Sequence, residues 1–245
     1  MEIQPPELSV VIPVYNEEEN IPILVRELEE ALNPLGKEYE IIMVDDGSRD
    51  RSLERIREAG RKNPRVRAIS FEANAGQTAA MDAGFRSARG DVIVTLDADL
   101  QNSPRDIPLL LEKIPEYDIV CGWRAERNDP WIRRISSRIA NSVRNALSHE
   151  EIKDIACSLK AYKRECFQKV KLYNGMHRFL PTLFKMEGFR AVEVRVGHFP
   201  RRHGTAKYNI RNRVFRSFVD LLAVRWMKKR QLNYRVREDL SDKGE

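Results

Sequence analysis

The stretch 92–102, VIVTLDADLQN, combines the pattern of a buried strand with a group of polar side chains directly after it. Its first five residues are apolar or β-branched, as in a strand that is covered on both faces of a sheet. Asp97, Asp99 and Gln101 then occupy alternate positions, and alternate side chains of an extended chain point to the same side. Two carboxylates and an amide oxygen on one side are suitable ligands for a hard divalent cation. On this stretch alone, a polar turn that closes the strand is the alternative.

Three further segments of the first half have the pattern of a strand followed by a helix. Strands are predicted at 8–14, 39–44 and 66–71, and helices at 16–32, from Asp50 onward, and at 78–88. With the strand at 92–96, this order predicts a mostly parallel sheet with helices on both faces. In such sheets ligands bind beyond the carboxyl ends of the strands. Three strand ends carry polar clusters, which therefore predict a site: Tyr15-Asn16-Glu17, Asp45-Asp46, and Asp97 with Asp99.

The loops of this predicted sheet lack the usual glycine-rich nucleotide motifs. The turn after the first strand reads PVYNEEEN and contains no glycine, so the G-x-G-x-x-G dinucleotide fingerprint is missing, and there is no P-loop sequence. The sequence therefore argues against a dinucleotide oxidoreductase and favours a nucleotide that is held through a metal ion.

The charges are divided unevenly along the chain. Residues 1–122 hold 14 Lys and Arg against 24 Asp and Glu, a net charge of −10, whereas residues 123–245 hold 29 against 13, a net charge of +16. A basic half of this kind is expected to bind an anion such as a phosphate, a membrane surface or a nucleic acid. A merely solvated basic surface is the alternative.

The second half is predicted to contain two more strands and three helices. The strands are expected at 118–122 and 193–201, and the helices at 130–147, 176–188 and 210–230. In the first of these helices an apolar stripe lies beside arginines, so this helix could lie on an anionic membrane or pack on the sheet, and the sequence leaves both open. The last helix has apolar residues on one side: Val214, Phe215, Phe218, Val219, Leu222 and Trp226.

Cysteine spacing and the N-terminal residues indicate the compartment. Cys121, Cys157 and Cys166 have no paired spacing, which favours a reducing environment over a disulfide framework. The N-terminal residues MEIQPPELS lack the pattern of a signal peptide, and no run of about 18 apolar residues occurs that could span a bilayer. We therefore expect a cytoplasmic protein.

Four motifs occur in a fixed order along the chain: PVYNEEENI, VDDGSRD, NAGQ and LDADLQN. In this order they resemble the inverting glycosyltransferases of family 2, which have the GT-A fold, an α/β fold with a Rossmann-like, mostly parallel sheet. The resemblance is strongest to the polyprenyl-phosphate branch, which includes dolichyl-phosphate mannosyltransferase, bactoprenol glucosyltransferases and undecaprenyl-phosphate formamido-arabinose transferase. It extends over roughly residues 8 to 230.

The resemblance implies a donor site for a nucleoside diphosphate sugar, with UDP favoured over GDP, in the half 1–122. It implies that Asp97, Asp99 and Gln101 hold Mg²⁺ or Mn²⁺ against the donor diphosphate, and that Asp45 or Asp46 contacts the base or ribose. The implied donor-binding residues are Pro13, Tyr15, Glu17, Asp45, Asp46, Gln77, Asp97 and Ala98.

The resemblance also implies an acceptor site in the half 123–230, followed by a flexible charged tail at 231–245. Guanidinium groups bind phosphate through paired hydrogen bonds. The implied acceptor-phosphate residues are Arg124, Arg127, Arg133, Ser137 and Lys207, with Arg134 and Arg138 as the alternative register for the second pair. The implied catalytic residues are Asp99, Arg124, Asp154 and Arg202, where Asp154 either lies near the acceptor phosphate or orients an arginine.

These observations predict a metal-dependent inverting glycosyltransferase that transfers a sugar to a polyprenyl phosphate such as undecaprenyl phosphate. Many similar enzymes continue into transmembrane helices, whereas this chain ends in a basic tail. We therefore expect peripheral attachment to the inner face of the cell membrane, and no nucleic-acid partner. Self-association as a homo-oligomer stays open. A saccharide or surface-polymer acceptor is the first alternative, and a non-catalytic protein that binds anionic surfaces is the second.

Overall fold

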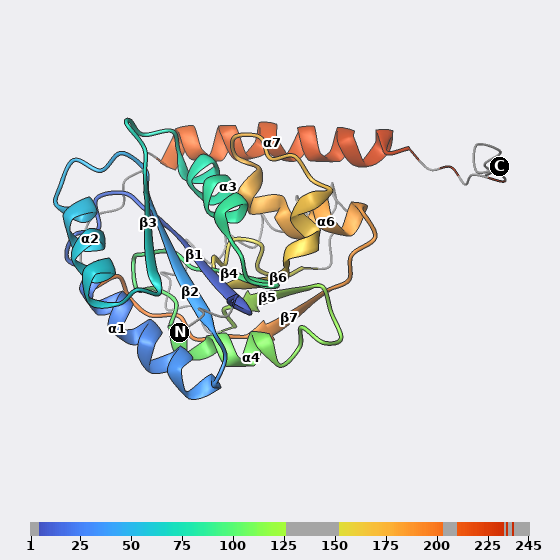
Figure 1. Cartoon of the computed structure of the whole chain (residues 1–245). Helices are drawn as coiled ribbons and strands as arrows, with labels where there is room; N and C mark the ends of the chain where they lie inside the picture. The colour runs from blue at the N-terminus through green and yellow to red at the C-terminus, as the bar shows by residue number, and fades with distance from the viewer. Residues whose placement is uncertain (1–4, 126–151, 203–209, 233, 235–236, 238–245) are drawn as a thin grey trace, which may run out of the picture.

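The computed structural model describes residues 5–125, 152–202, 210–232, 234 and 237, and its organising element is a seven-stranded sheet (Figure 1). The strand order is β3-β2-β1-β4-β6-β5-β7. The strands are β1 Leu8–Val14, β2 Tyr39–Asp45, β3 Val66–Ser70, β4 Val92–Thr95, β5 Ile119–Trp123, β6 Lys160–Lys163 and β7 Ala191–Arg195. The helices are α1 Ile21–Leu32, α2 Ser52–Lys62, α3 Gln77–Ser87, α4 Ile107–Leu111, α6 Leu180–Met186 and α7 Ile210–Arg230, with a 3₁₀ turn, η4, at Met176–Phe179.

The alternation of side chains along β1 explains why both faces of the sheet are covered. Val10 and Ile12 belong to a core cluster with the apolar residues of α1 and α4 and with Ile56 of α2. Val11, between them, belongs to a second cluster with residues of α3 and α6. Successive strand side chains point to opposite faces, so a fully apolar strand needs helices on both sides. The predicted α/β sheet with flanking helices is confirmed.

Gly84 allows α3 to lie directly on β1. A Cβ atom at this position would be 2.3 Å from Cγ1 of Val11, closer than real atoms approach. Only glycine gives the helix this short distance to the strand. The close contact fixes the start of α3, and with it Gln77, at the carboxyl edge of the sheet.

One strand of the sheet was not predicted. β6 lies between β4 and β5 and is antiparallel to both, with Val94 and Val120 each opposite Ala161. The sequence at 160–163, KAYK, is too short and too polar to indicate a strand, and only its position between two apolar strands makes it one. The boundary proposed between residues 122 and 123 falls inside β5, so strands of both halves form the same sheet.

Two predicted elements differ in length or type. The segment 176–188 begins as the 3₁₀ turn η4 and continues as α6, because Pro181 follows at the first turn of the α-helix. The predicted strand at 193–201 ends early: β7 stops at Arg195, and the residues after it run beside the loop that follows Gln101. The predicted helix at 130–147 lies outside the described residues.

The helix α7 extends along the outside of the molecule, next to α3 and α6 (Figure 1). Leu221 and Val224 of this helix pack against Met176, Phe179 and Leu183 in a third, smaller core cluster. The side chains predicted to share its apolar side, as far as they are described, are instead exposed to 44–64%: Phe218, Val219, Leu222 and Trp226. No helix in the described ranges has the length and apolar character needed to cross a bilayer.

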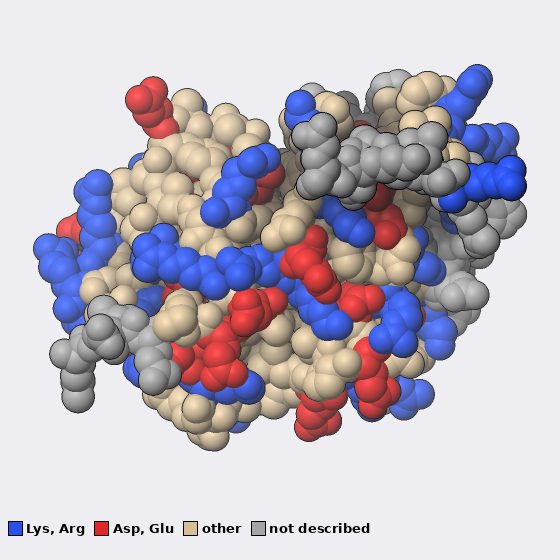
Figure 2. All heavy atoms as spheres, turned by 45° about the vertical axis from the view of Figure 1, so that its right-hand side comes forward, with Lys and Arg blue, Asp and Glu red and all other residues tan. Residues whose placement is uncertain are grey.

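Lys and Arg side chains are interspersed with Asp and Glu side chains over the face that Figure 2 shows. The division of charge along the sequence therefore does not appear as two separate patches on this face. Several acidic and basic side chains instead form local pairs, such as Arg202 with Glu27 and Arg105 with Glu30.

Candidate active site

A pocket opens at the carboxyl ends of β1, β2 and β4, where the sequence predicts a site. It has a volume of about 130 Å³. Its lining residues are Pro13, Val14, Tyr15, Glu17, Asp46, Gln77, Asp97, Ala98, Asp99 and Arg201. Of the eight residues that the resemblance implies for the donor, all but Asp45 line this pocket. Segments that are up to about 190 residues apart in the chain meet here, because parallel strands bring their carboxyl ends to one edge.

Asp45 and Asp46 have different surroundings, which separates their roles. The Asp45 carboxylate is buried and accepts hydrogen bonds from the Ser70 hydroxyl at 3.2 Å and the Ser48 amide at 3.3 Å, so it holds the turn after β2. Asp46 faces the pocket and accepts hydrogen bonds from the amides of Ala75 and Gly76 at 2.7 and 3.0 Å. Burial raises the pKa of Asp46, although these amide bonds oppose the shift.

Asp46 therefore fixes the NAGQ loop beside the pocket. Asn74 donates to Asp46 Oδ2 at 2.9 Å, in addition to the two amides. Gly76 has φ +94°, a conformation that side-chain-bearing residues rarely adopt. The result is that Gln77, the first residue of α3, projects toward Asp97.

Asp97 follows β4 and is the most perturbed acid of the pocket. Gln77 Nε2 donates to Asp97 Oδ1 at 2.9 Å. The backbone amide of Asp97 donates to Ser158 Oγ at 3.3 Å. Burial and the neighbouring Asp99 raise the pKa of Asp97 to about 6, although Ser158, Lys160 and Arg124 act in the opposite direction. A bound cation would favour the charged form of such a pair of carboxylates.

Asp99 lies beside Asp97 and is paired with an arginine from a distant segment. Arg201 Nη2 lies 2.8 Å from Asp99 Oδ2, and its Nη1 lies 3.6 Å from Oε1 of Glu17. The second oxygen of Asp99 accepts the Gln101 amide at 3.2 Å. Burial raises the pKa of Asp99, and the charge of Arg201 opposes this shift.

The residues present fit a divalent metal that shares its coordination with a ligand's phosphate oxygens. Asp99 is buried and Asp97 is partly buried, and both have raised pKa values, so a divalent cation would stabilise the charged form of these hard oxygen ligands. Within the described ranges no three acidic, His or Cys side chains form a complete ligand group of their own. The Gln101 side chain does not line the pocket, and its backbone carbonyl accepts the Phe199 amide at 2.9 Å.

A second hollow adjoins the first and shares Pro13, Gln77 and Asp97 with it. Its far side is lined by the segment 155–158 and by three residues that carry basic groups: Lys160, His177 and Arg178. Thr78 positions one of them, since its hydroxyl lies 2.7 Å from Nδ1 of His177. Basic groups next to Asp97 make this hollow suitable for an anionic ligand.

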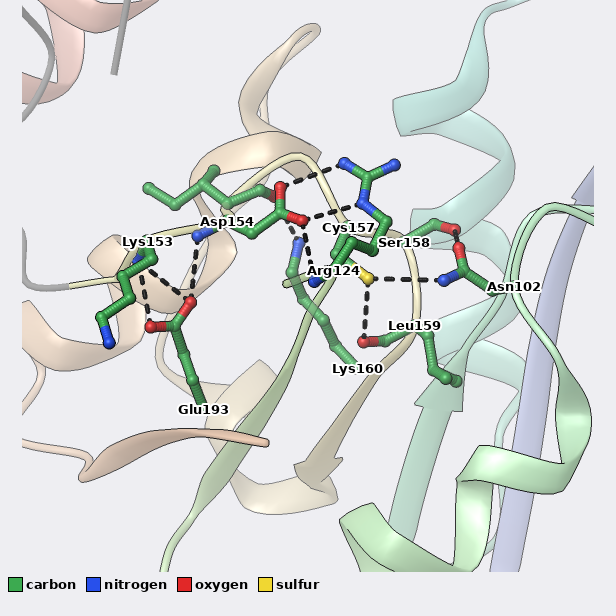
Figure 3. A network of polar contacts seen from close by, with 10 residues as sticks. Asn102, Arg124, Lys153, Asp154, Cys157, Ser158, Leu159, Lys160 and Glu193 are labelled. Carbon is green, nitrogen blue, oxygen red and sulfur yellow. Dashed lines mark hydrogen bonds and ion pairs between the residues drawn. The ribbon is translucent and has the colours of Figure 1, made fainter. Parts of the chain in front are cut away.

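Arg124 and Asp154 form the centre of a polar network beside this second hollow (Figure 3). Arg124 follows β5, and its Nε and Nη2 donate to the two carboxylate oxygens of Asp154 at 2.8 and 3.0 Å. Asp154 is only 2% exposed, and its amide donates to Glu193 of β7 at 3.0 Å. This geometry favours the role in which Asp154 orients an arginine over the role in which it contacts the acceptor phosphate itself.

The same network continues to the first pocket. Asn102 donates to Cys157 Sγ at 3.6 Å and accepts a hydrogen bond from Ser158 Oγ at 3.1 Å (Figure 3). Burial raises the pKa of the Cys157 thiol, so the thiol remains protonated. Its side chain packs in the hydrophobic core. Ser158 in turn accepts the amide of Asp97. The Cys157 amide also donates to the Asp154 carbonyl at 3.2 Å, so one connected set of contacts links Arg124 with Asp97.

Of the remaining predicted site residues, the structure describes only Arg202. Arg202 is half-exposed and pairs with Glu27 at 3.0 Å, and it does not line either hollow. The sequence analysis names Arg202, whereas its neighbour Arg201 is the arginine that lines the first pocket. Arg127, Arg133, Ser137 and Lys207 lie outside the described residues, as do Arg134 and Arg138.

Comparisons with known proteins agree with the fold and the motifs. Residues 9–171 match the family described as Glycosyl transferase family 2. The chain is 40% identical over 228 residues to dodecaprenyl-phosphate galacturonate synthase of Rhizobium johnstonii, covering 91% of this chain and 67% of that protein. It is 43% identical over 204 residues to undecaprenyl-phosphate 4-deoxy-4-formamido-L-arabinose transferase of Pseudomonas aeruginosa, covering 82% and 60%. The chain thus spans roughly two thirds or less of the length of these relatives.

A solved structure with a similar fold is glucosyl-3-phosphoglycerate synthase of Mycobacterium tuberculosis, crystallised with Mn²⁺ and UDP-glucose. The TM-score is 0.68 at 20% sequence identity, over 90% of this chain and 79% of that one. At this identity the likeness shows the fold alone.

Proposed function

The chain belongs to glycosyl transferase family 2, and from that premise we propose that it transfers a sugar from a nucleoside diphosphate sugar to a polyprenyl phosphate. The observation that carries the proposal is the pocket at the carboxyl edge of the sheet, where Asp97 and Asp99 lie beside Tyr15, Glu17 and Asp46. The relatives that are 40% and 43% identical are named as polyprenyl-phosphate enzymes, which supports this acceptor class.

The donor is proposed to lie in the first pocket. Tyr15, Glu17 and Asp46 offer an aromatic face and acceptor oxygens for a base and ribose, on the side of β1 and β2. Asp97 and Asp99 would hold Mg²⁺ or Mn²⁺, which neutralises the charge of the diphosphate leaving group. UDP is favoured over GDP as the nucleotide, in keeping with the sequence resemblance.

The acceptor phosphate is proposed to bind near Arg124, next to the second hollow. Asp154 uses Nε and Nη2 of Arg124, whereas Nη1 donates no hydrogen bond within the described part of the chain. Arg124 also lies close enough to Asp97 to affect its pKa. The guanidinium is thus oriented by its buried partner with one edge available for a phosphate oxygen.

The acceptor's own chemistry limits what the protein must supply. A phosphate monoester is already anionic near neutral pH, since its second pKa is about 6. It needs positioning by cationic groups more than it needs a strong general base. Arg124, oriented by Asp154, together with Lys160 and Arg178 would place the acceptor oxygen, so proximity and charge stabilisation account for most of the rate.

The exposed side of α7 is the proposed contact with the membrane. Phe218, Leu222 and Trp226 present apolar surface there, and the last turn of the helix adds Lys228, Lys229 and Arg230. Apolar side chains beside clustered cations are the combination that binds anionic bilayer surfaces. Such attachment, on the cytoplasmic side, would bring the site to a lipid-linked acceptor.

A donor and acceptor screen tests the proposal. The purified protein is incubated with UDP- and GDP-sugars, Mn²⁺ or Mg²⁺, and undecaprenyl phosphate, and release of nucleoside diphosphate is measured. We expect metal-dependent release that needs the lipid phosphate and falls by at least about 100-fold in Asp99→Ala. Metal-dependent turnover with a saccharide acceptor alone would contradict the acceptor assignment, and no metal-dependent nucleotide binding would contradict the donor site.

A further inference from the structure

The guanidinium of Arg201 occupies the part of the first pocket where the proposed metal would bind. It lies 2.8 Å from Asp99 Oδ2 and 3.6 Å from Glu17 Oε1, and so bridges acids that follow β4 and β1. The Arg201 side chain is 27% exposed, and those of Asp99 and Glu17 are 13% and 9% exposed. Among the described lining residues of this pocket, Arg201 is the one Lys or Arg.

We propose that Arg201 is an internal counter-ion for Asp99, and that a divalent cation binds at this carboxylate only by displacing it. Both Asp99 oxygens are engaged, one by Arg201 and the other by the Gln101 amide. Each of these oxygens keeps a second lone pair, so a metal at Asp99 would share the carboxylate with the Arg201 guanidinium unless that guanidinium moves away. Two positive charges at one poorly solvated carboxylate repel each other strongly, so the two occupants exclude one another. This inference rests on the proposed metal and donor site.

The segment that carries Arg201 allows this exchange without a large movement. The Gly197 amide donates to Asp106 Oδ2 at 2.8 Å, and the Phe199 amide donates to the Gln101 carbonyl at 2.9 Å. These bonds attach the backbone, four and two residues before Arg201, to the segment that follows Asp99. Rotation about the side-chain bonds of Arg201 is then sufficient to release the carboxylate.

The consequence is coupling between the metal and the nucleotide. A divalent metal alone must compete with an ion pair that is already formed in a partly buried site. A metal that arrives with a nucleoside diphosphate also brings anionic oxygens, to which the displaced guanidinium can donate. Arg201 therefore disfavours the metal alone and favours the metal together with its nucleotide.

Arg202 provides a matched control. It is the same residue type at the next position, but it pairs with Glu27 at 3.0 Å, on α1, and its side chain is 50% exposed. An exposed ion pair of this kind contributes little to the stability of the protein. Replacing Arg202 removes one positive charge from the same segment without touching Asp99.

The test is a titration of Mn²⁺ alone into the wild-type protein, Arg201→Gln and Arg202→Gln, with free Mn²⁺ measured by electron paramagnetic resonance. We expect Arg201→Gln to lower the dissociation constant of Mn²⁺ by about tenfold or more and Arg202→Gln to change it by less than about twofold. Arg201→Gln should also show a larger rise in melting temperature on addition of Mn²⁺. Arg201→Lys keeps the charge but cannot bridge both acids, and should fall between wild type and Arg201→Gln.

A second titration, with UDP and with GDP present, separates the possible failures. Unchanged or weaker Mn²⁺ binding by Arg201→Gln, while the wild type binds Mn²⁺ with a nucleotide, overturns the counter-ion role and leaves the proposed function standing. If Arg201→Gln does not fold, unchanged Mn²⁺ affinity in Arg201→Lys has the same meaning. Absence of Mn²⁺ binding with either nucleotide in the wild type overturns the proposed function and this inference together.

Discussion

The guanidinium of Arg124 and the carboxylate of Asp154 form a two-point ion pair, with Nε to Oδ2 at 2.8 Å and Nη2 to Oδ1 at 3.0 Å. The Arg124 amide adds a third hydrogen bond to Asp154 Oδ2 at 3.2 Å. The two side chains are 15% and 3% exposed, so the pair is nearly removed from water. Buried pairs of this kind orient their members, and loss of either partner leaves an uncompensated charge.

The first prediction concerns this pair. Asp154→Asn leaves the buried Arg124 without its counter-ion, so we expect a loss of on the order of 3 kcal/mol in the free energy of unfolding. Turnover with a lipid phosphate should fall by about 10- to 100-fold, because the guanidinium is no longer oriented. Urea unfolding and nucleoside diphosphate release measure the two effects.

A double variant provides the control for this prediction. Arg124→Ala combined with Asp154→Ala should be less damaging to stability than the two single effects added together, since neither charge is then left unpaired. Arg164→Ala, which breaks an exposed pair with Asp91, should change stability by less than about 0.5 kcal/mol. If the double variant loses as much free energy of unfolding as the two single variants added together, the predicted coupling between Arg124 and Asp154 is contradicted.

The second prediction concerns the pH dependence of stability. Burial and Asp99 raise the pKa of Asp97 to about 6, above its value in an unfolded chain, so the folded state binds this proton more tightly. The contribution of Asp97 to the free energy of unfolding therefore falls as the pH rises from about 4 through about 6. Asp97→Asn removes this charge and can still accept the hydrogen bond from Gln77.

We expect metal-free Asp97→Asn to be more stable than the wild type at about pH 8, by on the order of 1 to 2 kcal/mol, and the two to converge near pH 4. Urea unfolding across this pH range in a chelating buffer measures the difference. A wild type that becomes more stable relative to Asp97→Asn as the pH rises would contradict the predicted sign.

The third prediction separates two glutamines. Gln77 donates to Asp97 Oδ1 at 2.9 Å, whereas the Gln101 side chain does not line the donor pocket. Groups that orient a metal ligand typically contribute about 10- to 100-fold to metal affinity. We expect Gln77→Leu to weaken Mn²⁺ binding in the presence of nucleotide by about tenfold, and Gln101→Ala to have a smaller effect. Calorimetry of both variants decides whether the alternate spacing in LDADLQN marks a third ligand.

The fourth prediction concerns membrane attachment. Replacing Phe218 and Trp226, which are 46% and 64% exposed on α7, by Ser should lower binding to anionic vesicles by about tenfold or more. Leu109→Ser is the matched control, because Leu109 is 43% exposed on α4. Flotation with phosphatidylglycerol vesicles measures the effect. Equal loss of binding in the control, or none in the α7 variant, would contradict the assignment of this face.

Much of the fold could be predicted from the sequence because it depends on local order. Apolar strands such as 8–14 and 39–45 alternate with helices along the chain, and this alternation alone specifies a mostly parallel sheet. The position of the site followed from the same pattern, since parallel strands place Tyr15, Asp46 and Asp97 at one edge. The motifs also identified the family correctly.

Other features required the tertiary structure. β6 is a strand only because β4 and β5 bind it on both sides, and the sequence KAYK does not reveal these neighbours. The sequence does not reveal that Asp46 lines the pocket while Asp45 is buried beside it. It also does not reveal that Arg201 lines the pocket while Arg202 does not. Each depends on which way one side chain points after a turn, and the preceding residues do not fix that direction.

The sequence by itself therefore determined the order of the strands along the chain, the edge of the sheet at which the pocket opens and the acids that line it. Only the tertiary structure decided which cation faces those acids and which partner orients Arg124. The physical reason is that periodicity and turn chemistry act between near neighbours. The pairs Arg201–Asp99 and Arg124–Asp154 instead join residues that are 102 and 30 positions apart in the chain. Such residues come into contact only when the whole sheet has formed.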